Sequence, residues 1–298
     1  MYSFDKKIAL VVGAGSGIGR AIALELSRRG AVVCAADINT KGANETAEQI
    51  THEDRPAIGL PCNLTDDASV KGALAEIQRV YGDIDLVINT AGVLLNGNPE
   101  DIPYQEWERI FGVNVFGSVR LIEEVLPRML ERGEGYIATT ASVAGLYPFA
   151  ISRIPYAASK AALISMTENL AIYLRPKGIK VSCLCPGPTI TAITDSMKTW
   201  SDDVVVRGPG SDISLMPAEQ AATIFCNGIE EQRIIIPSHP AKTLEYLNQF
   251  SASPDNFIYD KIGKFACGEN GLPKVDLTDP VIAGALKALS PLGNSQDD

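Results

Sequence analysis

The segment Lys7-Ile-Ala-Leu-Val-Val-Gly-Ala-Gly-Ser-Gly-Ile-Gly19 decides the fold of this chain. Residues 7–12 are mainly apolar and rich in β-branched side chains, which is typical of a buried parallel strand. Residues 20–26, directly after the glycines, have the periodicity of a helix. A strand, a glycine-rich turn and a helix in this order direct free backbone N–H groups toward a phosphate. The segment therefore predicts a phosphate-binding turn in an α/β fold.

Strand-like and helical segments alternate after this turn. Further strands are predicted at residues 31–36, 57–61, 85–88, 135–141, 179–185 and 234–237. Such alternation requires a parallel sheet with helices on both faces. We therefore expect a doubly wound, Rossmann-type α/β sheet in a single domain, residues 1–237, followed by a C-terminal extension, residues 238–298. The extension contains a helical stretch at 242–249 and can cover the site, extend an oligomer interface or block one.

An acid ends the second predicted strand. Asp37 lies about 20 residues past the glycine turn, where a carboxylate accepts hydrogen bonds from an adenosine ribose. It would repel a 2′-phosphate, and no arginine follows it in residues 38–40. NAD is therefore favoured over NADP. The alternative is a helix cap on a strand–helix loop.

Tyr156 and Lys160 lie four residues apart in a predicted helix at 155–176, so their side chains share one helix face. An ammonium ~5 Å from a phenol, at an effective dielectric of ~20, favours the phenolate by roughly 3 kcal/mol, or about two pKa units. This pair is a candidate acid/base catalyst. We expect Tyr2, whose lysine is also four residues on, to lie in an exposed N-terminal arm.

Two further polar residues interrupt apolar segments. Ser142 stands at the end of the fifth strand, where ligands bind to doubly wound sheets, although many such serines cap turns. Asn114 lies between glycines within a helical stretch at 104–132. An asparagine is unfavourable there and marks a kink or a water site, or a polar residue at a helix crossing.

Composition excludes several classes of function. The net charge is −10 and no Lys/Arg-rich run occurs, so nucleic acid and membrane surfaces are poor partners. No apolar run could span a bilayer, and residues 1–7 do not resemble a secretory signal, so we expect a cytoplasmic protein. The six cysteines fit buried free thiols. A metal site is not expected, because Cys-x-x-Cys pairs are absent and the only histidines are His52 and His239.

Together these positions resemble the short-chain dehydrogenase/reductase family, in its compact single-domain branch. The following residues carry the resemblance: Gly13, Gly17, Ile18, Gly19, Asp37, Asn89, Thr90, Ala91, Gly92, Asn114, Ser142, Tyr156, Lys160, Pro186 and Gly187. The resemblance implies an NAD-dependent oxidoreductase. Tyr156 would be the general acid/base, Lys160 would lower its pKa and bind the nicotinamide ribose, Ser142 would hold the substrate oxygen, and Asn114 would anchor a water in a proton relay.

The resemblance also implies which residues contact the cofactor. They are Gly13, Ser16, Gly17, Ile18, Gly19, Asp37, Ile38, Asn63, Leu64, Asn89, Ala91, Gly92, Tyr156, Lys160, Pro186, Gly187, Thr189 and Thr191. By analogy with the family we expect a homo-oligomer, a tetramer or a dimer.

Three loops, at residues 93–98, 144–155 and 188–215, should wall the substrate pocket. Their apolar residues are Leu94, Leu95, Leu146, Tyr147, Phe149, Ile151, Ile190, Ile193, Met197 and Trp200. We expect a hydrophobic aryl or alicyclic secondary alcohol, or its ketone, as substrate; alternatively these side chains pack on one another. The competing functions are a 3-oxoacyl-carrier reductase, which Asp37 and the negative charge oppose, and a non-catalytic NAD-binding scaffold.

Overall fold

The computed structural model describes residues 1–191, 197–201 and 213–266 of this chain. Within these residues, seven parallel strands form one sheet. Their spatial order is β3 (Ala57–Pro61), β2 (Val32–Asp37), β1 (Ile8–Val12), β4 (Leu86–Asn89), β6 (Gly135–Thr140), β7 (Ile179–Cys185) and β11 (Ile235–Pro237). The expected doubly wound parallel sheet is confirmed.

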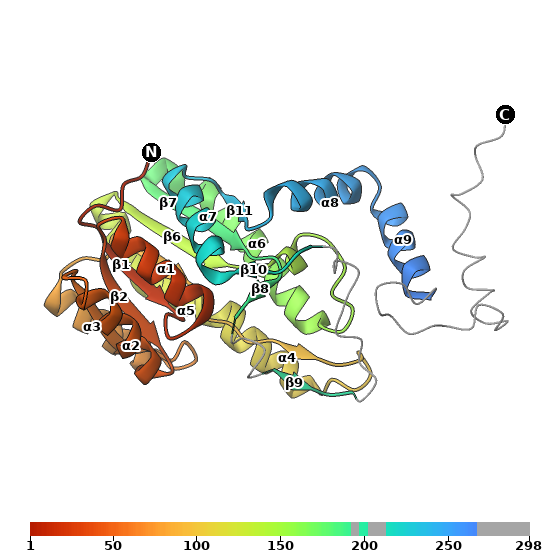
Figure 1. Ribbon diagram of the computed structural model, residues 1–298, viewed down its shortest axis with the longest axis horizontal. Coiled ribbons are helices and arrows are strands. Elements are labelled where there is room, and N and C mark those ends of the chain that lie inside the picture. The colour runs from red at the N-terminus through yellow and green to blue at the C-terminus, as the bar shows by residue number, and fades with distance from the viewer. Residues whose placement is uncertain (192–196, 202–212, 267–298) are drawn as a thin grey trace.

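The strand β1 shows why both faces of the sheet carry helices. Side chains alternate along a strand, so Ala9 and Val11 lie in one hydrophobic core while Leu10 and Val12 lie in the other. The first core holds buried side chains of α1 (Gly17–Arg28), α2 (Thr40–Thr51) and α7 (Ala218–Glu230). The second holds those of α3 (Asp67–Val80), α5 (Gly117–Arg132) and α6 (Ile154–Leu174). A strand that is apolar on both sides therefore lies at the centre of three layers (Figure 1).

The order of the strands reverses between β1 and β4. From β1 the chain adds β2 and β3 on one side, and from β4 it adds β6, β7 and β11 on the other. Ligands of doubly wound sheets bind at this switch point, beyond the carboxyl ends of the strands. The glycine turn after β1 and the end of β4 at Asn89 border this place.

The predicted helical stretch at 104–132 is three consecutive segments. They are α4 (Tyr104–Phe111), a π-helical turn (Gly112–Phe116) and α5. The turn contains Asn114, whose side chain is fully buried. The expected helix fault at Asn114 is therefore confirmed as a π turn, a feature that is frequent at functional sites.

The expectation that Tyr2 lies in an exposed arm is wrong. Its ring is buried and packs edge-on against Phe4 and Tyr136, at centroid distances of 5.6 and 4.9 Å. The Tyr2 backbone N–H donates to the carbonyl of Glu230 at 2.8 Å. The arm is ordered because it covers one end of the first core, next to the end of α7.

The described cysteines are Cys34, Cys62, Cys183, Cys185 and Cys226, and all five are buried free thiols, as expected. Burial raises the pKa of Cys34 to about 12 and that of Cys62 to about 11. These two thiols therefore stay protonated at neutral pH. The sixth, Cys267, lies outside the described residues.

Two helices follow β11: α8 (Pro240–Ala252) and α9 (Pro254–Ala266). This part of the extension is more helical than the predicted stretch at 242–249, and Figure 1 shows both helices leading away from β11. Tyr246 of α8 and Phe257 of α9 are buried against Tyr147, at ring-centroid distances of 5.3 and 6.1 Å. None of the described helices combines the length and apolar character needed to cross a membrane.

Candidate active site

The glycine turn has a backbone path that requires glycine at Gly13, Gly17 and Gly19. Gly13 and Gly17 have φ angles of +84° and +53°, in the region that favours glycine. A Cβ on Gly19 would lie 2.0 Å from the carbonyl oxygen of Gly13. The side chain of Ser16, the N-cap of α1, makes no capping hydrogen bond, so the first N–H groups of α1 are not taken by it. These residues fit the pyrophosphate of a dinucleotide.

The Asp37 carboxylate holds the turn from the side of β2. One oxygen accepts from Gly15 N at 2.8 Å and the other from Asn39 N at 2.8 Å. Ile38, next in the chain, is exposed. The carboxylate lies beside the turn, as expected for an acid that would accept hydrogen bonds from an adenosine ribose.

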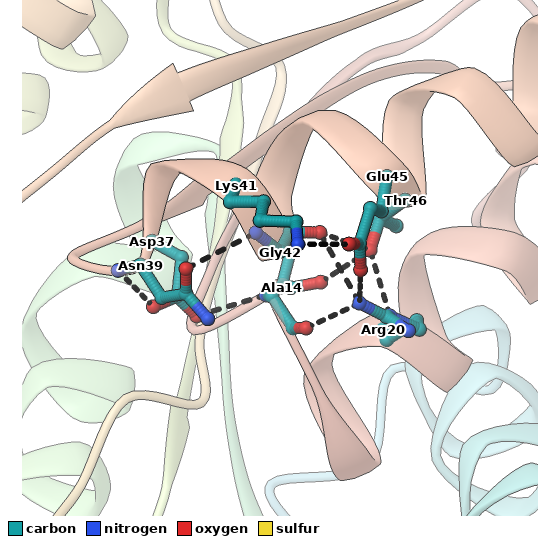
Figure 2. A network of polar contacts seen from close by, with 9 residues as sticks. Ala14, Arg20, Asp37, Asn39, Lys41, Gly42, Glu45 and Thr46 are labelled. Carbon is teal, nitrogen blue, oxygen red and sulfur yellow. Dashed lines mark hydrogen bonds and ion pairs between the residues drawn. The ribbon is translucent and has the colours of Figure 1, made fainter.

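Arg20, which the sequence did not single out, ties the turn to α2 (Figure 2). Its guanidinium donates to the Gly15 carbonyl at 2.6 Å and to Thr46 Oγ1 at 3.0 Å, and pairs with Glu45 at 3.2 Å. The Thr46 hydroxyl donates to the carbonyl of Ala14 at 2.8 Å. Thr46 is fully buried in the middle of α2, and the sequence carries no signal of that burial.

Several residues expected to contact the cofactor lie at or just after the ends of β3 and β4. Asn63 accepts from the Thr65 N–H at 3.0 Å, and Leu64 is buried. Asn89 accepts from Ala91 N at 3.0 Å and donates to Ser118 at 2.9 Å. These hydrogen bonds shape the ends of the two strands.

Asn114 ties the end of β4 to α6. Its Oδ1 accepts from the Val93 N–H at 2.8 Å, and its Nδ2 donates to the Val93 carbonyl and to Ser159 Oγ, each at 3.0 Å. A Cβ on Gly92 would lie 3.3 Å from both Asn114 Oδ1 and Lys160 Nζ. The π turn of one helix and the start of another therefore meet at Gly92.

Ser142, Tyr156 and Lys160 gather where β6 ends. Lys160 is almost fully buried, and its Nζ donates to the Thr140 carbonyl at 2.7 Å and lies 5.5 Å from the centroid of the Tyr156 ring. The Ser142 hydroxyl donates to the Pro186 carbonyl at 3.3 Å. The four residues expected to catalyse are thus carried by the π turn, the end of β6 and the first turns of α6.

Burial has the largest effect on the pKa values of Lys160 and Tyr156. It lowers the pKa of Lys160 to about 8. It also raises the pKa of Tyr156, while a hydrogen bond with Ser142 and the charge of Arg153 lower it. The sequence predicts a Tyr156 pKa lowered by Lys160. This is wrong for the structure because desolvation of the phenol, which spacing does not reveal, is the largest effect.

The last group of residues expected to contact the cofactor follows β7. Gly187 N donates to Ser238 Oγ at 2.9 Å, and Thr189 Oγ1 donates to the Gly187 carbonyl at 3.0 Å. A Cβ on Gly17 would lie 3.1 Å from Cβ of Thr191. The chain after β7 therefore returns to the glycine turn.

Comparisons with known proteins decide the family. The sequence profile described as short chain dehydrogenase matches residues 7–202.

This chain belongs to the short-chain dehydrogenase/reductase family.

Relatives and solved structures agree with this assignment. An uncharacterised oxidoreductase of Staphylococcus aureus (strain MW2) is 36% identical over 188 residues, which are 63% of this chain and 80% of that protein. A short-chain dehydrogenase/reductase of Burkholderia phymatum in complex with NAD has a TM-score of 0.73 at 28% identity, and the match covers 93% of this chain and 100% of that one. A 3-ketoacyl-(acyl-carrier-protein) reductase of Brucella melitensis complexed with NADH has a TM-score of 0.70 at 26% identity, covering 79% and 97%.

The residues of the expected substrate wall divide into three groups. Leu94 and Leu95 are buried, and Leu95 packs in a core cluster with Ile102 and Ile110, so it does not face an open pocket. A second group packs with the extension: Leu146, Tyr147 and Phe149. The third group has exposed or half-buried side chains: Ile151, Ile190, Met197 and Trp200. Ile193 lies outside the described residues.

Two polar residues near this wall carry no family motif. Asn96 is fully buried and accepts a hydrogen bond from Arg153 Nε at 2.6 Å. Arg153 is the N-cap residue of α6, three positions before Tyr156. An arginine and an asparagine inside otherwise apolar loops were the only sequence signal for them.

Proposed function

We propose that this protein is an NAD-dependent oxidoreductase that interconverts a hydrophobic aryl or alicyclic secondary alcohol and its ketone, with Tyr156 as general acid/base. One observation carries the proposal. Asn114, Ser142, Tyr156 and Lys160 lie at one place beyond the carboxyl ends of β4 and β6, next to the glycine turn. A scaffold that only bound the dinucleotide would not need this set.

The role of the chain is to position the alcohol and move its proton. The Tyr156 phenolate takes the proton of the alcohol as the ketone forms, and returns it in the reverse reaction. Ser142 donates a hydrogen bond to the substrate oxygen, and the Lys160 ammonium carries positive charge close to the phenol. The chemistry that NAD supplies when bound is the acceptance or donation of hydride. Asn114 anchors a water that passes the proton on.

The substrate class follows from the side chains beside Ser142. Phe149 follows it within a few residues and is only half-buried. Ile190 and Trp200, in the loop after β7, contribute exposed apolar surface. Apolar walls with few polar groups favour bulky hydrophobic ligands.

The proposal is tested by absorbance at 340 nm with NAD and a panel of aryl, alicyclic and short aliphatic secondary alcohols. We expect turnover with the aryl or alicyclic members. Activity on short polar alcohols alone would refute the substrate class. Binding of NAD with no turnover of any member would support a scaffold instead.

A second candidate is reduction of carrier-bound 3-oxoacyl groups. The likeness to the Brucella reductase favours it. The net charge of −10 opposes it, since such a substrate is delivered by an acidic carrier that docks on basic surface. A 3-oxoacyl thioester belongs in the same assay panel with NADH, and its preferred turnover would favour this second function.

Asp37 is expected to set the preference for NAD. Replacing it by serine removes a charge that repels a 2′-phosphate; at ~5 Å and an effective dielectric of ~20 this is worth roughly 3 kcal/mol per unit of phosphate charge before salt screening. We expect the ratio of kcat/KM with NADP to that with NAD to rise at least about tenfold. The lost hydrogen bond to Gly15 N affects both cofactors and cancels in the ratio.

Asp66→Ser is the matched control for Asp37→Ser. Asp66 also follows a strand and caps α3 by accepting from Ala68 N, a role that serine performs equally well. Its replacement should leave the cofactor ratio unchanged. An unchanged ratio in Asp37→Ser as well would show that the preference is set elsewhere.

We further propose that copies of the chain associate through α5 and α6. Phe116 and Val119 at the start of α5, and Ile172 and Tyr173 near the end of α6, are exposed. Exposed apolar side chains on long helices favour burial against a second copy. Sedimentation at micromolar concentration should give a dimer or tetramer, and a monomer would contradict the proposal.

A further inference from the structure

A positive charge lies beside the candidate catalytic tyrosine and comes from the N-cap of its own helix. The Arg153 carbonyl accepts from Ala157 N at 2.9 Å, which makes Tyr156 the third residue of α6. Residues three apart at the start of a helix are neighbours, and the charge of the guanidinium acts on the phenol while that of the phenol acts on the guanidinium. The guanidinium and the phenol are therefore neighbours at the start of α6.

The guanidinium is held from outside its helix. Arg153 Nε donates to Asn96 Oδ1 at 2.6 Å. Asn96 ends the short strand β5 (Leu95–Asn96), which pairs with β9 (Lys198–Thr199). The Asn96 carbonyl accepts from Trp200 N at 2.9 Å, and its Nδ2 donates to Met197 Sδ at 3.0 Å. Met197 and Trp200, which lie in a loop expected to wall the substrate pocket, therefore hold Asn96 in place. Asn96 in turn holds the Arg153 guanidinium.

The other charged groups around Tyr156 do not replace Arg153. The Lys160 ammonium on α6 donates a hydrogen bond to the Thr140 carbonyl at 2.7 Å. Cys185 of β7 acts in the opposite sense, because negative charge there would raise the pKa of the phenol. On α4, Glu106 is paired with Lys198 at 3.0 Å and Arg109 at 2.7 Å. The charge of Arg153 opposes the effect of burial on the pKa of Tyr156, and it adds to that of Lys160, whose Nζ lies 5.5 Å from the ring centroid.

We propose that Arg153 is a positioning residue for the proton transfer at Tyr156: its guanidinium, oriented by Asn96, stabilises the phenolate that accepts the proton of the alcohol. The inference rests on the proposed acid/base role of Tyr156. It adds a link between the loop and the chemistry, because the strand pair β5–β9 that positions Asn96 belongs to the segments expected to wall the substrate.

The test is the pH profile of kcat/KM for alcohol oxidation. In this direction the phenolate is required, so activity rises with pH through an acidic limb. In Arg153→Met we expect the acidic limb to move to higher pH by about one unit. At pH values below the limb, kcat/KM should therefore fall about tenfold. Arg153→Lys should restore most of the shift, since it restores the charge. Asn96→Ala should move the limb in the same direction by less, and the Kd for NAD should stay unchanged in all three.

Arg29→Met is the matched control. Arg29 is also a half-buried arginine, paired with Glu25 at 2.7 Å and Glu230 at 2.9 Å at the far end of α1. In Arg29→Met the acidic limb of the pH profile should stay where it is in the wild type. If Arg153→Met lowers kcat/KM equally at every pH, Arg153 only supports the fold and the inference is overturned. If Tyr156→Phe keeps its turnover, the proposed function fails instead, so the two failures are distinguishable.

Discussion

Tyr156→Phe is expected to lower kcat/KM for alcohol oxidation by on the order of 10²- to 10⁴-fold, the usual contribution of a general acid/base. The substitution removes one oxygen and leaves the ring in place between Ser142 and Lys160. NAD binding should therefore change little, and so should the melting temperature. Steady-state kinetics at 340 nm and a fluorescence titration with NAD measure the two effects separately.

Tyr173→Phe is the control that the chain itself offers. Tyr173 has Lys177 four residues on, with Nζ 3.5 Å from the ring centroid, so it repeats the spacing of the candidate pair. It is exposed near the end of α6, whereas Tyr156 lies in the first turn of this helix. This variant should retain full activity. Equal losses in the two variants would show that the phenol at 156 has no special role.

The acid/base role of Tyr156 also predicts how the rates of oxidation and reduction depend on pH. Burial raises the pKa of the phenol, so at neutral pH most of it is protonated and oxidation should accelerate as pH rises. Reduction of a ketone needs the protonated form and should lose activity at high pH. Tyr156→Phe should flatten both profiles. A wild-type oxidation rate that does not vary with pH would contradict this assignment.

Gly19→Ala is expected to weaken NAD binding by roughly 100-fold, or about 2.7 kcal/mol. The added Cβ would lie 2.0 Å from the Gly13 carbonyl oxygen and 2.4 Å from Thr90 Oγ1. The Gly13 backbone cannot move away freely, because its N–H donates to the Ala36 carbonyl at 2.8 Å. The turn must therefore deform, and its N–H groups lose their direction toward the pyrophosphate.

Gly72→Ala provides the comparison for Gly19→Ala. Gly72 is exposed within α3, and a Cβ there would meet no atom within 4 Å. Alanine is favoured over glycine in a helix by roughly 0.5–1 kcal/mol, so this variant should be slightly more stable. Its Kd for NAD, measured by calorimetry, should not change. An unchanged Kd in Gly19→Ala would mean that the pyrophosphate does not lie at this turn.

The parts of the fold that could be predicted are those whose cause is local. The apolar residues of β1 indicated a strand buried on both faces, and Ala9 and Leu10 do lie in opposite cores. Asn114 between glycines indicated a helix fault, and a π turn is found there. In each case the neighbouring residues alone carry the information.

Errors arose where distant segments decide the outcome. Tyr2 was expected in an exposed arm, but its ring packs on Tyr136 in the central sheet. Leu95 was expected in the substrate wall, but it is buried against Ile102 and Ile110. Loops have no periodicity that tells which side chains face inward, so their apolar residues could not be sorted from the sequence.

The sequence by itself determined the parallel sheet, the glycine turn after β1 and the order in which the motif residues occur. Strand and helix patterns are local, and a positive φ at Gly13 or Gly17 needs only glycine at that position. The tertiary structure alone decided the electrostatics of the site. The pKa of Tyr156 depends on its burial and on Arg153, and Arg153 depends on Asn96, 57 residues away in the chain. Desolvation and charge act through space, so they exist only once the chain has folded.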